Sequence, residues 1–286
     1  MAIFLRNGQK AIYDETQDKQ LKKLYGHIAG RAILKVMTLP VITNIGGAYM
    51  NSPLSKASIK KFIKKNNIDM TEYEEKSYKS YNDFFTRAIK EGARPIPEDP
   101  KVLMAPCDSK VSYYKIEDDT KITIKHTVYK LEDLLKSPRL ADEYKGGTCL
   151  VFRLTVDDYH HYHYFDNGTS EKEVIIPGIF HTVNPIANDY YPIYKTNTRH
   201  YTMIHSENFD DVVYMEVGAL MVGKIVNANK KEFKRGEEKG YFEFGGSTVV
   251  LLFKKDILNV DEDIIQHSKN HDEVKVKLGE RVAIHL

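Results

Sequence analysis

A pair of glycines followed by a serine lies between two apolar segments near the C-terminal end of the chain. The segment reads FEFGGSTVVLLF over residues 242 to 253, so Gly245 and Gly246 separate two predicted strands and Ser247 begins the second. Glycine adopts backbone angles that other residues avoid, and strained backbone tends to persist at functional sites. In such a turn the Ser247 hydroxyl could attack the carbonyl of Gly246 in an N-to-O acyl shift. An ordinary glycine hairpin loop would explain the same residues.

Three histidines lie close together in TVDDYHHYHYFDNG, residues 155 to 168. Histidine suits proton transfer near neutral pH because its unperturbed pKa is about 6.5. On a regular strand His161 and His163 share a face, which fits a general base or, with Asp158, a zinc site, whereas His160 points the other way. Histidines that simply belong to the surface or core of a tyrosine-rich strand are the remaining alternative.

A carboxylate that could support a histidine lies in LMAPCDSKVSYY, residues 103 to 114. Asp108 follows a proline and precedes a predicted strand, which places it on a loop. A carboxylate commonly fixes the tautomer of a catalytic histidine and stabilises its protonated form. An aspartate, a histidine cluster and a serine together are the parts of an activated serine nucleophile. Taken alone, Asp108 is more simply a solvent-facing loop residue.

These residues need a scaffold, and the apolar periodicity predicts a helical part followed by a β-rich part. Apolar residues recur every three or four positions from Leu21 to Val36, a second helix is expected at SIKKFIKKNN, and a third from Tyr81 to Ile89. Beyond about residue 103, short β-like segments with frequent tyrosine alternate with turn residues. We expect an α+β protein: a basic helical domain over 1–100, then an antiparallel, sandwich or barrel-like catalytic domain over 101–286.

The composition excludes several classes of protein. The chain has 286 residues, 42% of them hydrophobic, which argues against wholesale disorder. Two widely separated cysteines exclude a disulfide scaffold and a cysteine-rich zinc module, and they fit a reducing compartment. The sequence has neither the apolar run of roughly 18 residues that a bilayer-spanning helix needs nor a secretory signal, so a cytoplasmic location is expected.

Positive charge is concentrated in one segment, although the net charge is only +2. Residues 19 to 68 contain no Asp or Glu, and their basic residues are Lys19, Lys22, Lys23, Arg31, Lys35, Lys56, Lys60, Lys61, Lys64 and Lys65. Such a block usually binds phosphate, in nucleic acid or anionic lipid. A solvated helix face is the alternative interpretation.

As a set, these motifs resemble the phosphatidylserine decarboxylases. The resemblance runs from about residue 59 to residue 284 and includes NDFFTRAIKEGARPI, the Asp108 loop, DYHHYHYFDNG, HTVNPIA, HSENF, MEVGALMVGKI and FGGSTVVLLF. Phe-Phe-x-Arg, Gly-Ala-Arg-Pro and Gly-Ser-Thr before an apolar strand are specific in combination. The chain departs from the family pattern at Cys107, Ser109, His126 and His161.

The resemblance implies that the chain cuts itself between Gly246 and Ser247. The Ser247 hydroxyl attacks Gly246, the ester breaks by β-elimination, and the dehydroalanine left behind hydrolyses to a pyruvoyl group with loss of ammonia. A heterodimer of a β piece and an α piece results. Asp108, His163 and Ser247 match the charge-relay set for this cleavage, and His160 matches a histidine that assists decarboxylation by proton transfer.

The implied activity is decarboxylation of phosphatidylserine to phosphatidylethanolamine through a Schiff base with the pyruvoyl group, which accepts electrons as pyridoxal phosphate would. No metal or diffusible cofactor is required. The basic segment then fits an interfacial amphipathic helix that docks on an anionic membrane. We therefore expect phosphatidylserine and an anionic membrane surface as partners, no nucleic acid, and a peripheral location on the cytoplasmic side of the cell membrane.

Three alternatives remain open from the sequence. The first is a pyruvoyl decarboxylase of a free amino acid, which would not need a membrane-binding segment. The second is a metallohydrolase that uses Asp158, His161 and His163. The third is a non-catalytic lipid-binding homologue that never cleaves, for which the altered residues around Asp108 are the only indication.

Overall fold

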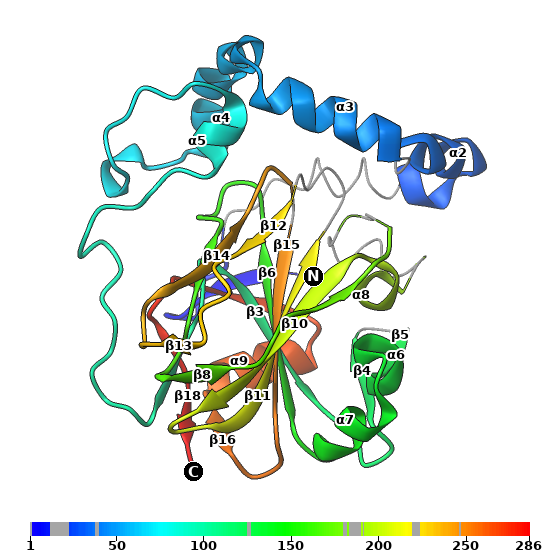
Figure 1. Cartoon of the computed structure of the whole chain (residues 1–286), viewed down its shortest axis with the longest axis vertical. Helices are drawn as coiled ribbons and strands as arrows, with labels where there is room; N and C mark the ends of the chain where they lie inside the picture. Colours follow the sequence, from blue (N-terminus) through cyan, green and yellow to red (C-terminus); the bar gives the residue numbers. More distant parts are fainter. Residues whose placement is uncertain are drawn as a thin grey trace.

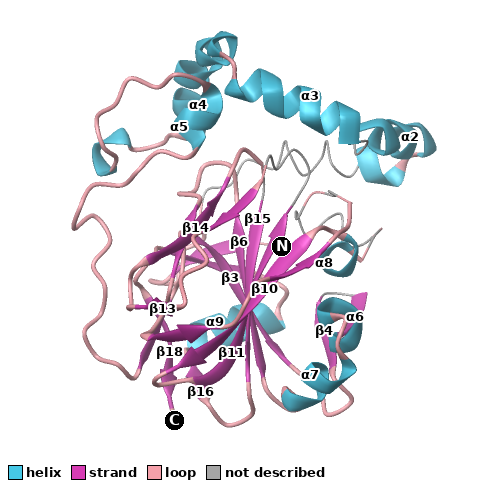
Figure 2. Ribbon diagram, in the orientation of Figure 1, coloured by secondary structure: helices cyan, strands magenta, loops and turns pink. Residues whose placement is uncertain are grey.

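The computed structural model describes residues 2–11, 23–37, 40–124, 127–179, 182, 190, 192–218, 224–245 and 247–286. Gly246, Lys19, Lys22, His126 and most of HTVNPIA lie outside these residues. The N-terminal part of the chain is mainly helical, and the remaining body is mainly strands with a few short helices, as the colouring by secondary structure shows (Figure 2). The expected α+β class is confirmed.

The N-terminal helices lie in a row across one end of the body (Figure 1). They are α2 (Ile28–Met37), α3 (Pro40–Asn51), the 3-10 helix η1 (Pro53–Ser58), α4 (Ile59–Asn66), the 3-10 helix η2 (Met70–Glu72) and α5 (Tyr81–Phe85). We call residues 28–66, from α2 to α4, the helical arm. Pro40 begins α3, as proline can at the first position of a helix, where its missing N–H is not needed.

The strands of the body and its remaining helices follow in chain order. The strands are β1 (Ile3–Leu5), β2 (Val102–Met104), β3 (Ser109–Lys115), β4 (Lys121–Ile124), β5 (Thr127–Lys130), β6 (Thr148–Leu154), β7 (His161–His163), β8 (Gly168–Ser170), β9 (Val174–Ile176), β10 (Arg199–Ser206), β11 (Asp210–Gly218), β12 (Ile225–Asn227), β13 (Glu232–Phe233), β14 (Glu238–Phe242), β15 (Ser247–Phe253), β16 (Leu258–Val260), β17 (Glu273–Val276) and β18 (Arg281–His285). The helices are α6 (Leu131–Leu135), α7 (Pro138–Glu143), α8 (Ile193–Thr196) and α9 (Glu262–Lys269).

One ten-stranded sheet organises the body. Its order is β1-β17-β3-β6-β15-β11-β10-β8-β13, and β9 also pairs with β10. Among the described strand pairs only β1–β17 is parallel, and β1, which comes from the region expected to be helical, forms one edge of this sheet. The two edge strands β1 and β13 do not pair with each other in the described chain, so the sheet is open and forms no closed barrel.

Strand β15 lies in the middle of this sheet, and all seven of its residues are buried. It pairs with β6 on one side and β11 on the other. Val249 and Leu251 belong to the apolar core on one face, while Val250 and Leu252 belong to the core on the opposite face. Because both faces are covered, the strand is a continuous apolar run, and alternation places Ser247 on the same face as Val249.

Candidate functional site

Ser247 is fully buried at the start of β15, opposite Leu154 of β6 and Gly218 of β11. The preceding turn contains Gly245 with φ of 144°, a conformation that glycine adopts without steric cost. The Ser247 Oγ atom has no hydrogen-bond partner in the described structure. A buried polar atom without a partner requires an explanation, and a chemical role is one of the few available.

His160 is held at the end of β14, because the Phe242 N–H donates to the His160 carbonyl at 3.0 Å. The His160 side chain is fully buried, and its Nδ1 lies 3.0 Å from the Asp158 carbonyl. A carbonyl can only accept, so Nδ1 carries the proton and Nε2, which has no partner, keeps its lone pair. Burial lowers the pKa of His160 to about 3, so the ring is neutral and can act as a base at pH 7.

His163 lies at the other end of β7, opposite Glu238 of β14. Its backbone N–H donates to the Pro106 carbonyl at 2.8 Å, which attaches it to the loop that carries Asp108. Burial lowers the pKa of His163 to about 4 and outweighs the attraction of the Glu238 and Asp108 carboxylates. With this pKa the second imidazole is also neutral at pH 7, and its Nδ1 atom has no hydrogen-bond partner in the described structure.

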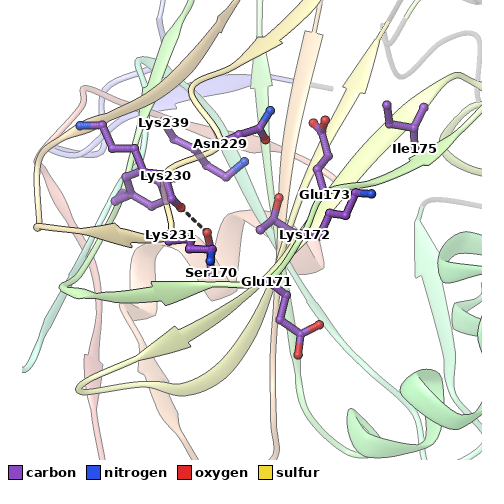
Figure 3. Close-up of a pocket in the computed structure, with 11 residues that line it drawn as sticks. Ser170, Glu171, Lys172, Glu173, Ile175, Asn229, Lys230, Lys231 and Lys239 are labelled. Carbon is purple, nitrogen blue, oxygen red and sulfur yellow. Dashed lines mark hydrogen bonds between the residues drawn. The ribbon is translucent and has the colours of Figure 1, made fainter.

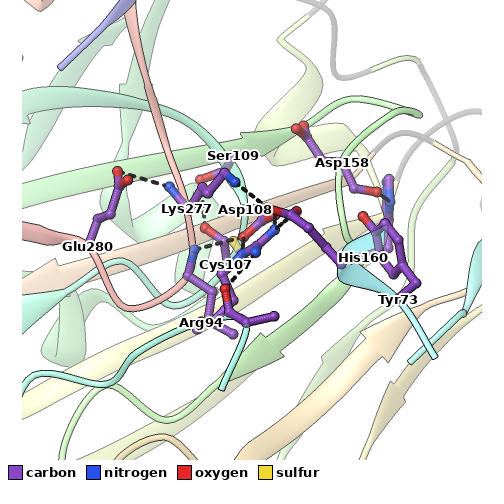
Figure 4. Close-up of polar contacts among 12 residues, drawn as sticks. Tyr73, Arg94, Cys107, Asp108, Ser109, Asp158, His160, Lys277 and Glu280 are labelled. Carbon is purple, nitrogen blue, oxygen red and sulfur yellow. Dashed lines mark hydrogen bonds and ion pairs between the residues drawn. The ribbon is translucent and has the colours of Figure 1, made fainter. Parts of the chain in front are cut away.

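Asp108 is buried and engaged by an arginine (Figure 4). Arg94 Nε and Nη2 donate to its two carboxylate oxygens at 2.9 and 2.6 Å, and the Leu278 N–H donates to Oδ1 at 2.8 Å. Arg94 Nη2 also donates to Glu72 at 2.9 Å. Burial alone would lower the pKa of Arg94, but the hydrogen bonds and charges of Asp108 and Glu72 raise it. A hollow of about 220 Å³ opens beside this pair.

The contacts of the four described site residues are mostly made through the backbone. His160 is hydrogen-bonded to the end of β14, Ser247 begins β15, and His163 is attached to the Asp108 loop through the Pro106 carbonyl. In the described residues no hydrogen bond connects Asp108 to His163, or His163 to Ser247. The relay of Asp108, His163 and Ser247 stays a prediction.

Unpartnered polar atoms nevertheless point to these same residues. In the described part of the chain, nine buried side-chain nitrogen and oxygen atoms lack a hydrogen-bond partner. Three of them belong to His160, His163 and Ser247, which sequence reasoning selected without knowledge of burial. Folded proteins leave few buried polar atoms unpaired, so these three atoms are candidates for a chemical role.

Sequence comparisons match the segments that carry these residues. The sequence model described as "Phosphatidylserine decarboxylase" matches residues 81–284, from α5 to β18. The chain belongs to the phosphatidylserine decarboxylase family. Family membership makes it a carboxy-lyase, as the sequence analysis predicted.

Curated relatives cover almost the whole chain. It is 47% identical to "Phosphatidylserine decarboxylase proenzyme 2" of Clostridium acetobutylicum over 285 residues, which cover 99% of this chain and 98% of that protein. It is 40% identical to "Phosphatidylserine decarboxylase proenzyme" of Clostridium botulinum (strain 657) over 97% of this chain and 96% of that protein. The protein of the same name from Clostridium novyi is 39% identical, with 98% of each chain covered.

The residues of the zinc alternative have other partners in this decarboxylase-family chain. The Asp158 carboxylate accepts from Lys110 Nζ at 2.6 Å and from the Thr155 N–H at 2.7 Å. His161 Nδ1 lies 2.8 Å from Glu238, and its Nε2 lies 3.3 Å from the Thr86 carbonyl. Among the described residues no three His, Cys, Asp or Glu side chains are arranged to hold a metal ion.

Sequence reasoning gave no role to Arg94, Lys110 or Asn82. Arg94 lies within the Gly-Ala-Arg-Pro segment quoted for the family, but its partner Asp108 is 14 positions away. Lys110 is paired with an aspartate 48 positions away. The basic and acidic residues were visible in the sequence, whereas their pairing depends on which strands and loops meet.

A larger cavity lies elsewhere on the decarboxylase body (Figure 3). Its volume is about 490 Å³, and it is lined by residues of β8, β9 and β10 together with the segment around Lys230. Two of its lysines are paired, since Lys239 donates to the buried Glu216 at 2.6 Å and Lys230 to Glu237 at 3.0 Å. The predicted site residues do not line this cavity in the described structure.

Proposed function

We propose that the chain decarboxylates phosphatidylserine to phosphatidylethanolamine with a pyruvoyl group formed from Ser247 by self-cleavage after Gly246. The observation that carries this proposal is the buried, unpartnered Ser247 hydroxyl directly after a glycine turn, in a chain whose relatives are named proenzymes. A pyruvoyl group supplies a carbonyl that accepts the electrons released as CO₂ leaves.

The chain provides the surroundings that self-cleavage needs. The Ser247 Oγ proton must leave as the bond from Oγ to the Gly246 carbonyl carbon forms, and a neutral imidazole can take it. Both His160 and His163 are neutral with a free ring nitrogen. We assign the cleavage relay to Asp108, His163 and Ser247, and proton transfer during decarboxylation to His160. Full burial of Ser247 limits hydrolysis of the ester before β-elimination, after which one water molecule hydrolyses the dehydroalanine to the pyruvoyl group and ammonia.

The sheet explains why the two pieces would remain together as a heterodimer. The C-terminal piece, residues 247–286, contributes β15 to β18 and α9. Its β15 lies between β6 and β11, its β17 pairs with β3, and its β18 pairs with β2. All of these partner strands precede the cleavage site, so cutting the backbone leaves the ladders and the core intact.

We also propose that the helical arm docks on an anionic membrane at the cytoplasmic face. Large apolar side chains are exposed on α2, α3 and η1: Ile28, Ile33, Val41, Ile42, Ile45, Tyr49 and Leu54. Exposed lysines follow on η1 and α4: Lys56, Lys60, Lys61, Lys64 and Lys65. No helix in the described part of the chain is long and apolar enough to cross a bilayer. Apolar residues that enter the interface beside lysines that face anionic lipid suit peripheral binding.

Intact-mass analysis of purified protein tests the proposal. The wild-type chain should give two species that separate at the Gly246–Ser247 bond, and Ser247→Ala should give one uncut, inactive chain. Thr248→Val is the matched control, because Thr248 is the next residue and its buried hydroxyl also lacks a partner. This variant should still be cut.

The substrate is tested by measuring CO₂ release from phosphatidylserine, lysophosphatidylserine and free serine side by side. Activity on the lipids with none on free serine is expected. A single unbroken chain that still decarboxylates phosphatidylserine would contradict the pyruvoyl mechanism. Cleavage with activity on free serine alone would favour the amino-acid alternative, and an uncut chain that binds lipid without turnover would favour the non-catalytic one.

A further inference from the structure

Helix α5 connects the helical arm to the segment that precedes Ser247. Asn82, in the first turn of α5, is buried with both ends of its amide engaged. Its Nδ2 donates to the Asn51 side chain at the end of α3, at 3.0 Å. Its Oδ1 accepts the backbone N–H of Phe244 at 2.9 Å. One side chain thus joins α3 to the turn that leads into the proposed cleavage site.

Aromatic contacts hold α5 against the same segment. The ring of Phe244 packs edge to face on Tyr81 and on Phe85, with centroid distances of 5.0 and 5.3 Å. The ring centroids of Phe85 and His160 are also only 4.1 Å apart. The first residue of α5 is itself held by η1, because the Ser55 hydroxyl accepts the Tyr81 N–H at 2.8 Å. The helix therefore contacts both the turn before Ser247 and a proposed proton-transfer residue.

The turn itself has little regular backbone pairing in its described part. Strand β14 ends at Phe242 and β15 begins at Ser247. Between them the Glu243 N–H donates to the Lys224 carbonyl at 2.9 Å, and Phe244 donates to Asn82. Gly245, which follows, has the positive φ of 144°. Without the Asn82 acceptor, the Phe244 N–H loses its partner and the entry into the glycine turn is no longer fixed.

We propose that Asn82 is a positioning residue for self-cleavage. By holding the Phe244 N–H it fixes the path of the chain into Gly245, and so the orientation of the following peptide bond relative to the Ser247 hydroxyl. This inference rests on the proposed self-cleavage. It adds that cleavage also depends on Asn82, a residue outside the proposed relay of Asp108, His163 and Ser247. Because attack needs close alignment of oxygen and carbonyl carbon, a small loss of order in the turn reduces the cleavage rate.

The test follows self-cleavage of full-length chain over time in a cell-free translation pulse-chase. Asn82→Leu removes the acceptor at similar size and should slow cleavage about tenfold or more, the effect of one lost hydrogen bond to a partly buried N–H. Asn82→Asp keeps an acceptor oxygen and should restore cleavage to within about threefold of wild type. Ser80→Ala is the control: it removes the side-chain cap of α5 without touching Phe244, and should cleave at close to the wild-type rate.

The outcomes separate this inference from the proposed function. If wild type is never cut, the proposed function fails. If wild type is cut and Asn82→Leu is cut equally fast, or if Ser80→Ala slows cleavage as much as Asn82→Leu does, the positioning role is wrong. Should Asn82→Leu not fold by circular dichroism, hydrogen exchange of the Phe244 amide is compared between Asn82→Ser and Asn82 in the uncut Ser247→Ala chain. Faster exchange of that amide, together with slower cleavage of Asn82→Ser in the chain that keeps Ser247, supports the inference, whereas unchanged exchange or unchanged cleavage overturns it.

Discussion

Lowering the pH should destabilise the folded chain, because two histidines are buried in their neutral form. Burial lowers the pKa of His160 to about 3 and that of His163 to about 4, whereas an unfolded histidine has a pKa of about 6.5. Between these values the unfolded chain binds more protons than the folded one. The contribution of each neutral histidine to stability is therefore complete above pH 6.5 and is lost as the pH falls below it.

The size of the effect follows from this difference. At pH 5 an unfolded histidine is almost fully protonated, 1.5 units below its pKa, while both native rings stay neutral. One unit corresponds to about 1.4 kcal/mol, so each histidine costs about 2 kcal/mol at pH 5 and the two together about 4 kcal/mol. The cost of about 2 kcal/mol per histidine hardly changes with the native pKa as long as that pKa lies below about 4.

Urea unfolding of the uncut Ser247→Ala chain at pH 7.5 and pH 5.0 provides the assay. In a second chain that also carries His160→Gln, the loss of unfolding free energy between the two pH values should be smaller by about 2 kcal/mol. Within one chain, the difference in unfolding free energy between the two pH values does not contain the pH-independent cost of the substitution. When this difference is compared between the two chains, the titration of the other groups cancels. His27→Gln, at an exposed histidine, is the matched control. An equal loss in the His160→Gln chain and its parent would refute the reasoning.

Further predictions concern the relay, the arginine pair and the membrane surface. His163→Gln should leave the chain uncut in intact-mass analysis, and complete cleavage would assign the proton transfer to another group. Arg94→Met leaves Asp108 buried without its cation and should lower the unfolding free energy of the uncut chain by about 3–5 kcal/mol in urea; a loss below about 1 kcal/mol would contradict this. Leu54→Asp, in the helical arm, should weaken cosedimentation with anionic vesicles by about tenfold or more, whereas Val128→Asp, at an exposed apolar position of the body, should not; equal effects would exclude docking through the helical arm.

Local patterns in the sequence determined much of the fold. The apolar run after Ser247 predicted a buried strand, and β15 is buried on both faces. The spacing of apolar residues predicted helices in the first part of the chain, and α2, α4 and α5 lie there. The third predicted helix ends at Phe85 instead of Ile89. Residues 3–5 were not predicted as a strand, because a three-residue edge strand acquires its conformation from β17.

The sequence by itself determined the residues with chemistry: a serine after two glycines, a histidine cluster and a loop aspartate, together with the family that this combination indicates. Tertiary structure alone decided their surroundings. It paired Asp108 with Arg94, buried the His160 ring completely and brought Asn82 to Phe244 across 162 positions of sequence. Burial and long-range hydrogen bonds depend on which strands and helices pack together. They set the protonation of a histidine and the path of a turn, and neither can be read from nearest neighbours in the chain.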